Sequence, residues 1–234
     1  MHFSISFIFD VTAISHQLTY LLDLTFYKTG AWNVWQNFKA AQDVQRTIAT
    51  KANGSLSHAV STNLISRSDF QLLHRSAHDV RRVPIFALIF VIFGEYTPLV
   101  VIYMSNLVPW PCRTPQQILS DRRKLEERRK TSIQNLVIPV PQGSVDIGSL
   151  APQQIAHIAR SLGLFSSWTD RLLGSGPLVQ RLLRRRIQRR VQYLHHDDQL
   201  IQRDGGPQQM EMEEIRMALV ERGVDVLGRP DAQL

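Results

Sequence analysis

One apolar run in the first half of the chain limits what the rest can fold into. From Ile85 to Met104 the only formally charged residue is Glu95. A helix rises about 1.5 Å per residue, so the run covers roughly 30 Å, the thickness of the hydrocarbon core of a bilayer. The alternative is a buried helix of a soluble bundle, but such a helix usually keeps a polar face, and this run has none. We therefore predict one transmembrane helix at about residues 84–104.

Two residues within this run, Glu95 and Pro98, do not suit a plain membrane helix. Proline at position 98 cannot bond to the carbonyl of Gly94 and crowds it, so we expect a kink beside the carboxyl group. A charged side chain at the centre of a membrane helix costs about 2.5–3.5 kcal/mol. Protonation, a partner helix or a bound cation would have to offset that cost. Glu95 is therefore either a packing group or a group that moves ions or protons within an oligomer.

Helical patterns also dominate the first 65 residues. Apolar residues at three- and four-residue spacings predict a helix from Leu18 to about Ala49, interrupted at Gly30. Its aromatic residues lie near Lys28 and Lys39, which fits either a helix at a membrane interface or packing against the rest of the protein. These aromatic residues are Trp32, Trp35 and Phe38.

Helix-capping signals place the remaining elements. Ser66 and Asp69 have capping-box spacing before a helix that runs to Arg82. Thr114 and Gln117 do the same for a helix from Pro115 to about Asn135. Four shorter helices are expected at Pro152–Leu162, Trp168–Leu173, Pro177–His195 and Met210–Arg222. We predict an all-α chain with four parts: an N-terminal segment (1–65), a pre-membrane helix and span (66–112), a charged helix and linker (113–148), and a small helical domain (149–234).

The helix from Pro177 has the densest positive charge in a chain of net charge +7. One face is apolar, with Val179, Leu183, Ile187 and Leu194. The opposite face holds Arg181, Arg184, Arg185 and Arg189, and Arg186 and Arg190 fall at the edge of the apolar face. An exposed arginine array binds phosphates through counterion release, which favours RNA or an anionic membrane as partner. A solvated face is the alternative.

No arrangement typical of an enzyme is recognised. His195-His-Asp-Asp198 contains metal-ligand types, but neighbours on a helix point in different directions, and an Asp here is more simply the N-cap of a short helix at 199–203. Cys112 is the only cysteine, so no disulfide or thiolate metal site is expected. We expect no catalysis, no cofactor and no metal.

Four collinear stretches resemble the LETM family, the leucine-zipper/EF-hand-containing transmembrane proteins of the mitochondrial inner membrane. They are Phe26-Tyr-Lys-Thr-Gly30, residues 66–84, the span with Glu95 and Pro98 up to Pro109, and the basic and acidic segments from Leu182 to Gly223. The resemblance implies a helical matrix-facing domain that binds the mitochondrial ribosome and supports membrane insertion of mitochondrially made proteins. It also implies a role in cation/proton exchange. The family's leucine zipper and EF-hand are missing, so Ca²⁺ regulation is not implied.

On this basis we predict a single-pass inner-membrane protein that binds the mitochondrial ribosome through the arginine helix, with its C-terminal domain in the matrix. Expected partners are rRNA or ribosomal proteins, inner-membrane lipids and further copies of the chain. Two alternatives stay open. One is K⁺ or Ca²⁺ exchange for protons through oligomerised spans around Glu95, and the other is a lipid-bound scaffold that shapes the membrane.

Overall fold

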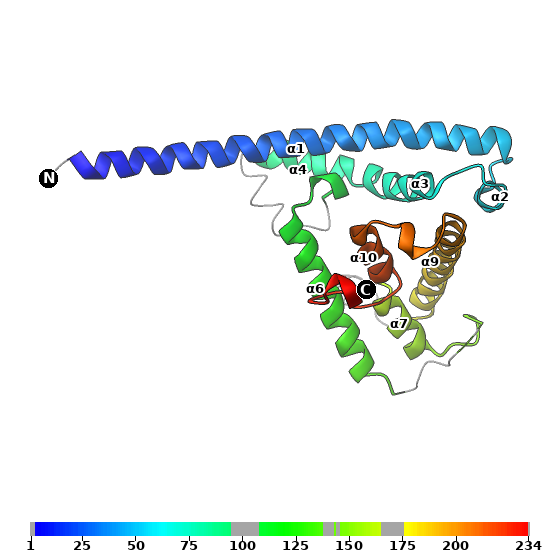
Figure 1. Cartoon of the computed structure of the whole chain (residues 1–234). Helices are drawn as coiled ribbons and strands as arrows, with labels where there is room; N and C mark the ends of the chain where they lie inside the picture. The colour runs from blue at the N-terminus through cyan, green and yellow to red at the C-terminus, as the bar shows by residue number, and fades with distance from the viewer. Residues whose placement is uncertain (1–2, 95–107, 138–142, 144–145, 165–175, 234) are drawn as a thin grey trace. The chain divides into compact units, whose positions relative to one another are not determined.

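The computed structural model describes residues 3–94, 108–137, 143, 146–164 and 176–233. Helices and connecting turns make up these ranges, and no strand occurs within them (Figure 1). The prediction of an all-α chain is therefore confirmed. The chain divides into two compact units, Met1–Gln117 and Ile118–Leu234.

The first unit is built on one long helix. Helix α1 (Phe3–Lys51) packs on α3 (Arg67–Val80) and on the short 3-10 helix η3 (Trp110–Cys112), with α2 (Leu56–Ser61) in the turn between α1 and α3 (Figure 1). The predicted interruption at Gly30 is wrong, because α1 continues through it. Glycine serves there to allow close packing: a Cβ at this position would lie 2.6 Å from the Sγ of Cys112.

Both predicted capping boxes are present. The backbone N–H of Asp69 donates to Oγ of Ser66 at 3.1 Å, and the N–H of Ser66 donates back to Oδ2 of Asp69 at 3.1 Å. The N–H of Gln117 donates to Oγ1 of Thr114 at 3.3 Å, and the N–H of Thr114 donates to Oε1 of Gln117 at 3.0 Å. Each box satisfies two donors that a helix start leaves open, which is why these signals were readable from sequence.

Within the part of the chain that the structure describes, the predicted transmembrane helix is not found. Helix α4 covers Val83–Phe93, and Gly94 follows with φ +47°, a left-handed conformation that ends a right-handed helix. Eleven residues of helix extend about 16 Å, roughly half of a bilayer core. Among the described residues, none of the helices combines the length and the apolar character needed to cross a membrane. Glu95, Pro98 and the expected kink lie outside the described residues.

The second unit contains α6 from residue 118 onward (whole helix Pro115–Gln134), α7 (Pro152–Ser161), α9 (Pro177–Arg203) and α10 (Met212–Glu221), with short 3-10 turns η4 (Pro207–Gln209) and η5 (Asp231–Gln233). Its main apolar core joins α7 to α9, and the members are Leu150, Ile155, Ala159, Val179, Leu183 and Ile187. The apolar stripe predicted for α9 is thus confirmed at three of its four positions. The predicted helix at 168–173 lies outside the described residues.

One buried arginine joins three helices of this unit. The Nε of Arg129 on α6 donates to the carbonyl oxygen of Ser161 at 2.7 Å, and its Nη2 donates to that of Val220 at 2.8 Å. Its remaining charge is balanced by Glu126, one turn earlier on α6. Both carbonyls lie in the last turn of their helices, where few backbone donors remain. That of Val220 also accepts from the backbone N–H of Gly223 at 3.1 Å, and the guanidinium adds a charged donor to each carbonyl.

Candidate functional site

The arginines predicted as ribosome-binding residues do not form one exposed array. Arg184 donates to the carbonyl oxygens of Gly148 at 2.7 Å and Leu150 at 2.8 Å, and also to that of Ile147. Its guanidinium therefore holds the segment before α7 onto α9. The expectation that Arg184 faces solvent for a partner is wrong, because unpaired carbonyls in a turn are strong acceptors for a guanidinium.

The two arginines at the edge of the apolar face also have partners within the unit. The guanidinium of Arg190 lies 5.0 Å from the ring centroid of Tyr193 and 3.8 Å from a carboxylate oxygen of Glu221 on α10. The Nη1 of Arg186 donates to the carbonyl oxygen of Leu164 at 3.3 Å. Arg181, Arg185 and Arg189 are exposed and follow one another at four-residue spacing, which makes one solvated stripe along α9.

The acidic pair at the end of α9 has a structural partner that sequence reasoning missed. Asp197 is fully buried and accepts from Nη2 of Arg222 at 2.8 Å, and Asp198 accepts from Nε of the same arginine at 3.1 Å. The prediction that an Asp caps a separate helix at 199 is wrong, since α9 continues to Arg203. Within the described ranges no group of His, Cys, Asp and Glu is arranged to hold a metal ion.

This ion-pair cluster also perturbs a neighbouring phenol. Tyr193 on α9 is buried and donates to Oε2 of Glu221 on α10 at 3.1 Å. Burial raises the pKa of Tyr193, and the nearby Glu221 and Asp197 raise it further. The cluster therefore holds α10 against the end of α9, and its charged groups are occupied with one another.

The unexplained feature of the first unit is the apolar surface of α4. Ile85, Leu88, Val91 and Ile92 lie on one side of this helix and are 44%, 58%, 80% and 64% exposed. We call these four residues the α4 apolar face. The other side is buried, with Phe86 packed on Val108 and Cys112. A contiguous set of large exposed apolar residues marks a surface that contacts a membrane or another protein.

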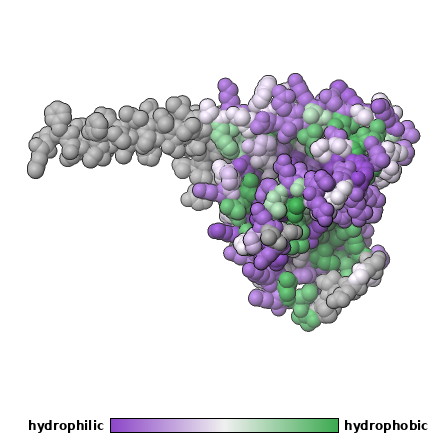
Figure 2. Space-filling model, in the orientation of Figure 1, coloured by the Kyte–Doolittle hydropathy of each residue, from purple (hydrophilic) through white to green (hydrophobic). Residues whose placement is uncertain are grey.

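Exposed tryptophans paired with cations occur in the same unit. The Nζ of Lys39 lies 5.2 Å from the ring centroid of Trp35, and the guanidinium of Arg113 lies 5.0 Å from that of Trp110. Trp32 is 60% exposed and lines, with Trp35 and Lys28, a depression of about 620 Å³ on α1. One of the two interpretations of these aromatic residues was that they pack against the rest of the protein. It is wrong for Trp32 and Trp35, because both side chains are exposed. Figure 2, in which hydrophobic residues are green, shows apolar patches between purple hydrophilic ones.

A comparison with known proteins identifies the family. A model for the pentamidine resistance factor domain (PNT1) matches residues 41–204, well over half of the chain. No match was found among curated proteins or among solved structures.

The match shows that the resemblance to the LETM family is wrong, and the predictions of ribosome binding and of cation/proton exchange are wrong as well. The motifs behind it were helix caps, an apolar run and a basic amphipathic helix. Such features follow from general helix physics, so unrelated helical proteins share them. The prediction of a mitochondrial location is confirmed. The prediction of a single-pass topology has no helix to support it among the described residues. The chain belongs to the pentamidine resistance factor (PNT1) family, a family of mitochondrial type.

Proposed function

We propose that this protein is a non-enzymatic mitochondrial factor that binds the surface of an anionic membrane, the inner membrane, through the α4 apolar face. The observation behind the proposal is the exposure of four large apolar side chains on a helix whose opposite side is packed. A helix of about 16 Å that packs on the protein with one side and exposes apolar residues on the other suits a position in the plane of the interface, with the exposed side against the acyl chains.

The charges and exposed aromatic rings of the first unit favour a lipid surface over a protein partner. Arg81 and Arg82 directly precede the helix. The pairs Trp35–Lys39 and Trp110–Arg113 combine an amphipathic ring with a cation. Tryptophan is enriched at the headgroup level of membranes, and basic residues there are attracted to anionic lipids by about 1 kcal/mol each.

The size of the apolar face is sufficient for reversible binding. Fully burying a Val, Leu or Ile side chain contributes about 1.5–3 kcal/mol. If insertion removes roughly half of the exposed area of the four residues, which are 44–80% exposed, the gain is on the order of 2–4 kcal/mol. Together with the basic residues this predicts an affinity that responds measurably to the loss of two side chains.

The family name associates the domain with resistance to pentamidine. Pentamidine is an aromatic dication, and a chain of net charge +7 does not attract it by long-range electrostatics. We therefore ascribe the resistance to what the protein does at the membrane and not to capture of the drug.

Vesicle co-sedimentation tests the proposal. The full chain is expected to sediment with vesicles of phosphatidylcholine and cardiolipin, and much less with phosphatidylcholine alone. The double variant Leu88→Ser/Ile92→Ser is expected to bind at least about tenfold more weakly, which corresponds to about 1.4 kcal/mol.

The matched control is Leu178→Ser/Val191→Ser, which removes two exposed apolar residues from α9, where Leu178 is 72% and Val191 48% exposed. It should bind vesicles like the parent, and circular dichroism should show unchanged helix content in both variants. Equal binding by the α4 variant and the control would exclude the α4 apolar face as the membrane contact.

A further inference from the structure

The depression of about 620 Å³ on α1 has the composition of a ligand site. We call it the α1 depression. Its lining combines two indole rings, one cation and three smaller side chains: Thr25, Lys28, Thr29, Ala31, Trp32 and Trp35. Trp32 and Trp35 are three residues apart and therefore lie on the same side of the helix. The smaller side chains beside them leave the space between the rings open.

The α1 depression lies on the side of α1 opposite to its packed side. Gly30 lies against Cys112 of η3, and Val34 and Ala41 are buried, so these positions face the rest of the first unit. Trp32 is two residues away from both Gly30 and Val34, which corresponds to a rotation of about 200° around a helix. The helix therefore turns the indole rings away from the core of the unit.

Trp35 is held in one orientation by its own helix. The Nζ of Lys39 lies 5.2 Å from the centroid of its ring, and the ring centroid of Phe38 lies 6.0 Å away. Residues three and four positions apart are neighbours on a helix, so both contacts are local and form with the helix itself. A wall that is ordered before binding lowers the entropy cost of taking up a ligand.

The charge of the lining limits which ligand fits. Lys28 is the one charged side chain among the six lining residues. It makes no ion pair with any residue in the described ranges. One ammonium group matches one negative charge, which is what a phosphodiester carries, whereas a phosphate monoester carries about −1.5 to −2 at neutral pH. The α1 depression therefore suits a phosphodiester.

The indole rings favour a phosphodiester that is attached to apolar groups. Tryptophan rings are amphipathic and concentrate at the headgroup level of membranes, with an N–H that can donate to an oxygen. RNA is also a phosphodiester, and its bases stack on tryptophan. A strand of RNA, however, brings one charge with every nucleotide, and the next cation along this side of α1, Lys39, already lies over Trp35. One cation beside two rings suits a single lipid better than a series of phosphates.

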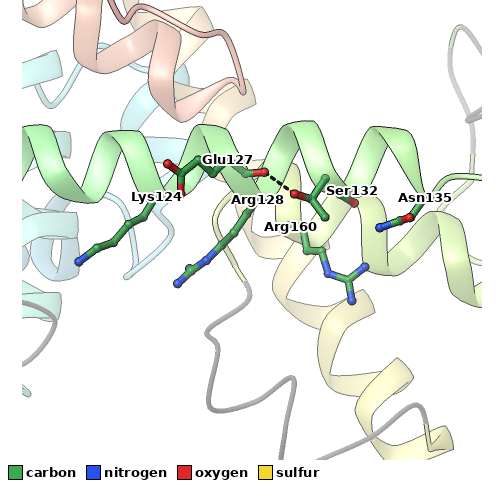
Figure 3. A pocket seen from close by; sticks show the side chains of 7 residues that line it. Lys124, Glu127, Arg128, Ser132, Asn135 and Arg160 are labelled. Carbon is green, nitrogen blue, oxygen red and sulfur yellow. Dashed lines mark hydrogen bonds between the residues drawn. The ribbon is translucent and has the colours of Figure 1, made fainter.

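A hollow of similar size in the second unit provides a contrast (Figure 3). It lies between α6 and α7 and has a volume of about 590 Å³, and its lining includes the carboxylate of Glu127 but no aromatic ring. The hydroxyl of Thr131 donates to the carbonyl oxygen of Glu127 at 2.8 Å, and Arg160 also interacts within the chain. Of the two hollows, the α1 depression alone has aromatic walls for an apolar ligand.

We propose that the α1 depression binds a single anionic glycerophospholipid, with its phosphodiester against Lys28 and its glycerol and ester groups against Trp32 and Trp35. A hollow of this volume accommodates a ligand of that size. The preference for a lipid over RNA rests on the proposed function, which places the same unit at a membrane. The α1 depression shares no residue with the α4 apolar face, so each site can be tested without the other.

The test uses the full chain with Leu88→Ser/Ile92→Ser, so that the α4 apolar face does not contribute. Calorimetric titration with dihexanoyl-phosphatidylglycerol, kept below its micelle concentration, should show one bound molecule per chain. Adding Lys28→Gln/Trp32→Ser should weaken binding at least tenfold. Circular dichroism should show unchanged helix content, because Trp32 is 60% exposed. Lys51→Gln is the matched control, since Lys51 is exposed on α1 outside the lining; it should change the affinity less than twofold.

Two further ligands distinguish the sources of a phosphodiester. Glycerophosphoglycerol, which is the same headgroup without acyl chains, should bind at least tenfold more weakly than the lipid, and equal binding would overturn the role of the rings. Tighter binding of a single-stranded RNA oligonucleotide than of the lipid would overturn the proposal, as would no binding of the lipid or an equal loss in the Lys51 control. Failure of the proposed function would appear elsewhere, as equal vesicle binding by the α4 variant and its control, whatever the titration gives.

Discussion

Where α1 crosses η3, position 30 has no room for a side chain. A Cβ at Gly30 would lie 2.6 Å from Sγ of Cys112 and 3.0 Å from the carbonyl oxygen of Pro111. The sequence presented this glycine as a helix interruption, because glycine in a helix costs about 1 kcal/mol relative to alanine. The close approach of α1 and η3 at this position requires a glycine despite that cost.

Two opposing effects make Gly30→Ala informative. Helix propensity alone predicts stabilisation by about 1 kcal/mol, whereas a clash in a packed contact costs about 1–3 kcal/mol. We expect the clash to dominate, so that the free energy of unfolding measured by denaturant titration falls by about 1–2 kcal/mol.

Adding Cys112→Ala to this variant should restore part of the loss, since the sulfur is the nearest atom. The single variant Cys112→Ala completes the double-mutant cycle. Additive effects of the two substitutions would show that the contact between α1 and η3 is not the cause of the loss of stability in Gly30→Ala.

The thiol of Cys112 gives a prediction on pH. Burial and, to a smaller extent, the negative charge of Asp79 together raise its pKa from 9.0 to about 11. The folded state therefore favours the neutral thiol, so its contribution to stability is complete below pH 9 and is lost as pH rises from about 9 to 11. Unfolding titrations at several pH values should show this decline, and Cys112→Ala should flatten it. Iodoacetamide at pH 8 should label the thiol slowly until denaturant is added.

At the scale of elements, α9 shows what a helical pattern can and cannot predict. Its start at Pro177 and its apolar stripe follow from the spacing of Val179, Leu183 and Ile187, and all three are buried. The role of Arg184 could not be predicted, because its acceptors are backbone carbonyls 34 to 37 residues earlier. Side-chain pattern carries no information about where a distant turn leaves its carbonyls unpaired.

The clamp made by Arg184 predicts a difference between neighbouring arginines. Arg184→Gln should lower the free energy of unfolding by about 1–3 kcal/mol, because the carbonyl oxygens of Gly148 and Leu150 lose a charged donor. Arg185→Gln, at an exposed position on the same helix, should change it by less than about 0.5 kcal/mol. Thermal unfolding measures both, and hydrogen exchange of the amides around Leu150 should increase only in the first. Equal effects of the two substitutions would contradict the clamp.

For the whole molecule, features that depend on neighbouring residues could be predicted from the sequence. Features that depend on residues far apart in the chain could not. The capping boxes at Ser66 and Thr114 and the all-α class follow from rules that act within a few residues. The end of α4 at Gly94 could not be derived, since hydropathy over 85–104 measures composition and not backbone conformation. The aromatic candidates Trp32 and Trp35 were visible in the sequence, but the pairing of Asp197 and Asp198 with Arg222 was not, because this arginine lies 25 and 24 residues later.

The buried guanidinium of Arg129 has a consequence for the order in which the protein is made. Its acceptor at Ser161 is synthesised 32 residues later and the one at Val220 91 residues later. During synthesis α6 and α7 exist long before α10, yet the pocket for this charge is incomplete until Val220 has been added. A buried cation with unfilled donors is unfavourable, so the second unit cannot reach its final packing helix by helix. We expect it to remain open around Arg129 until α10 has been added.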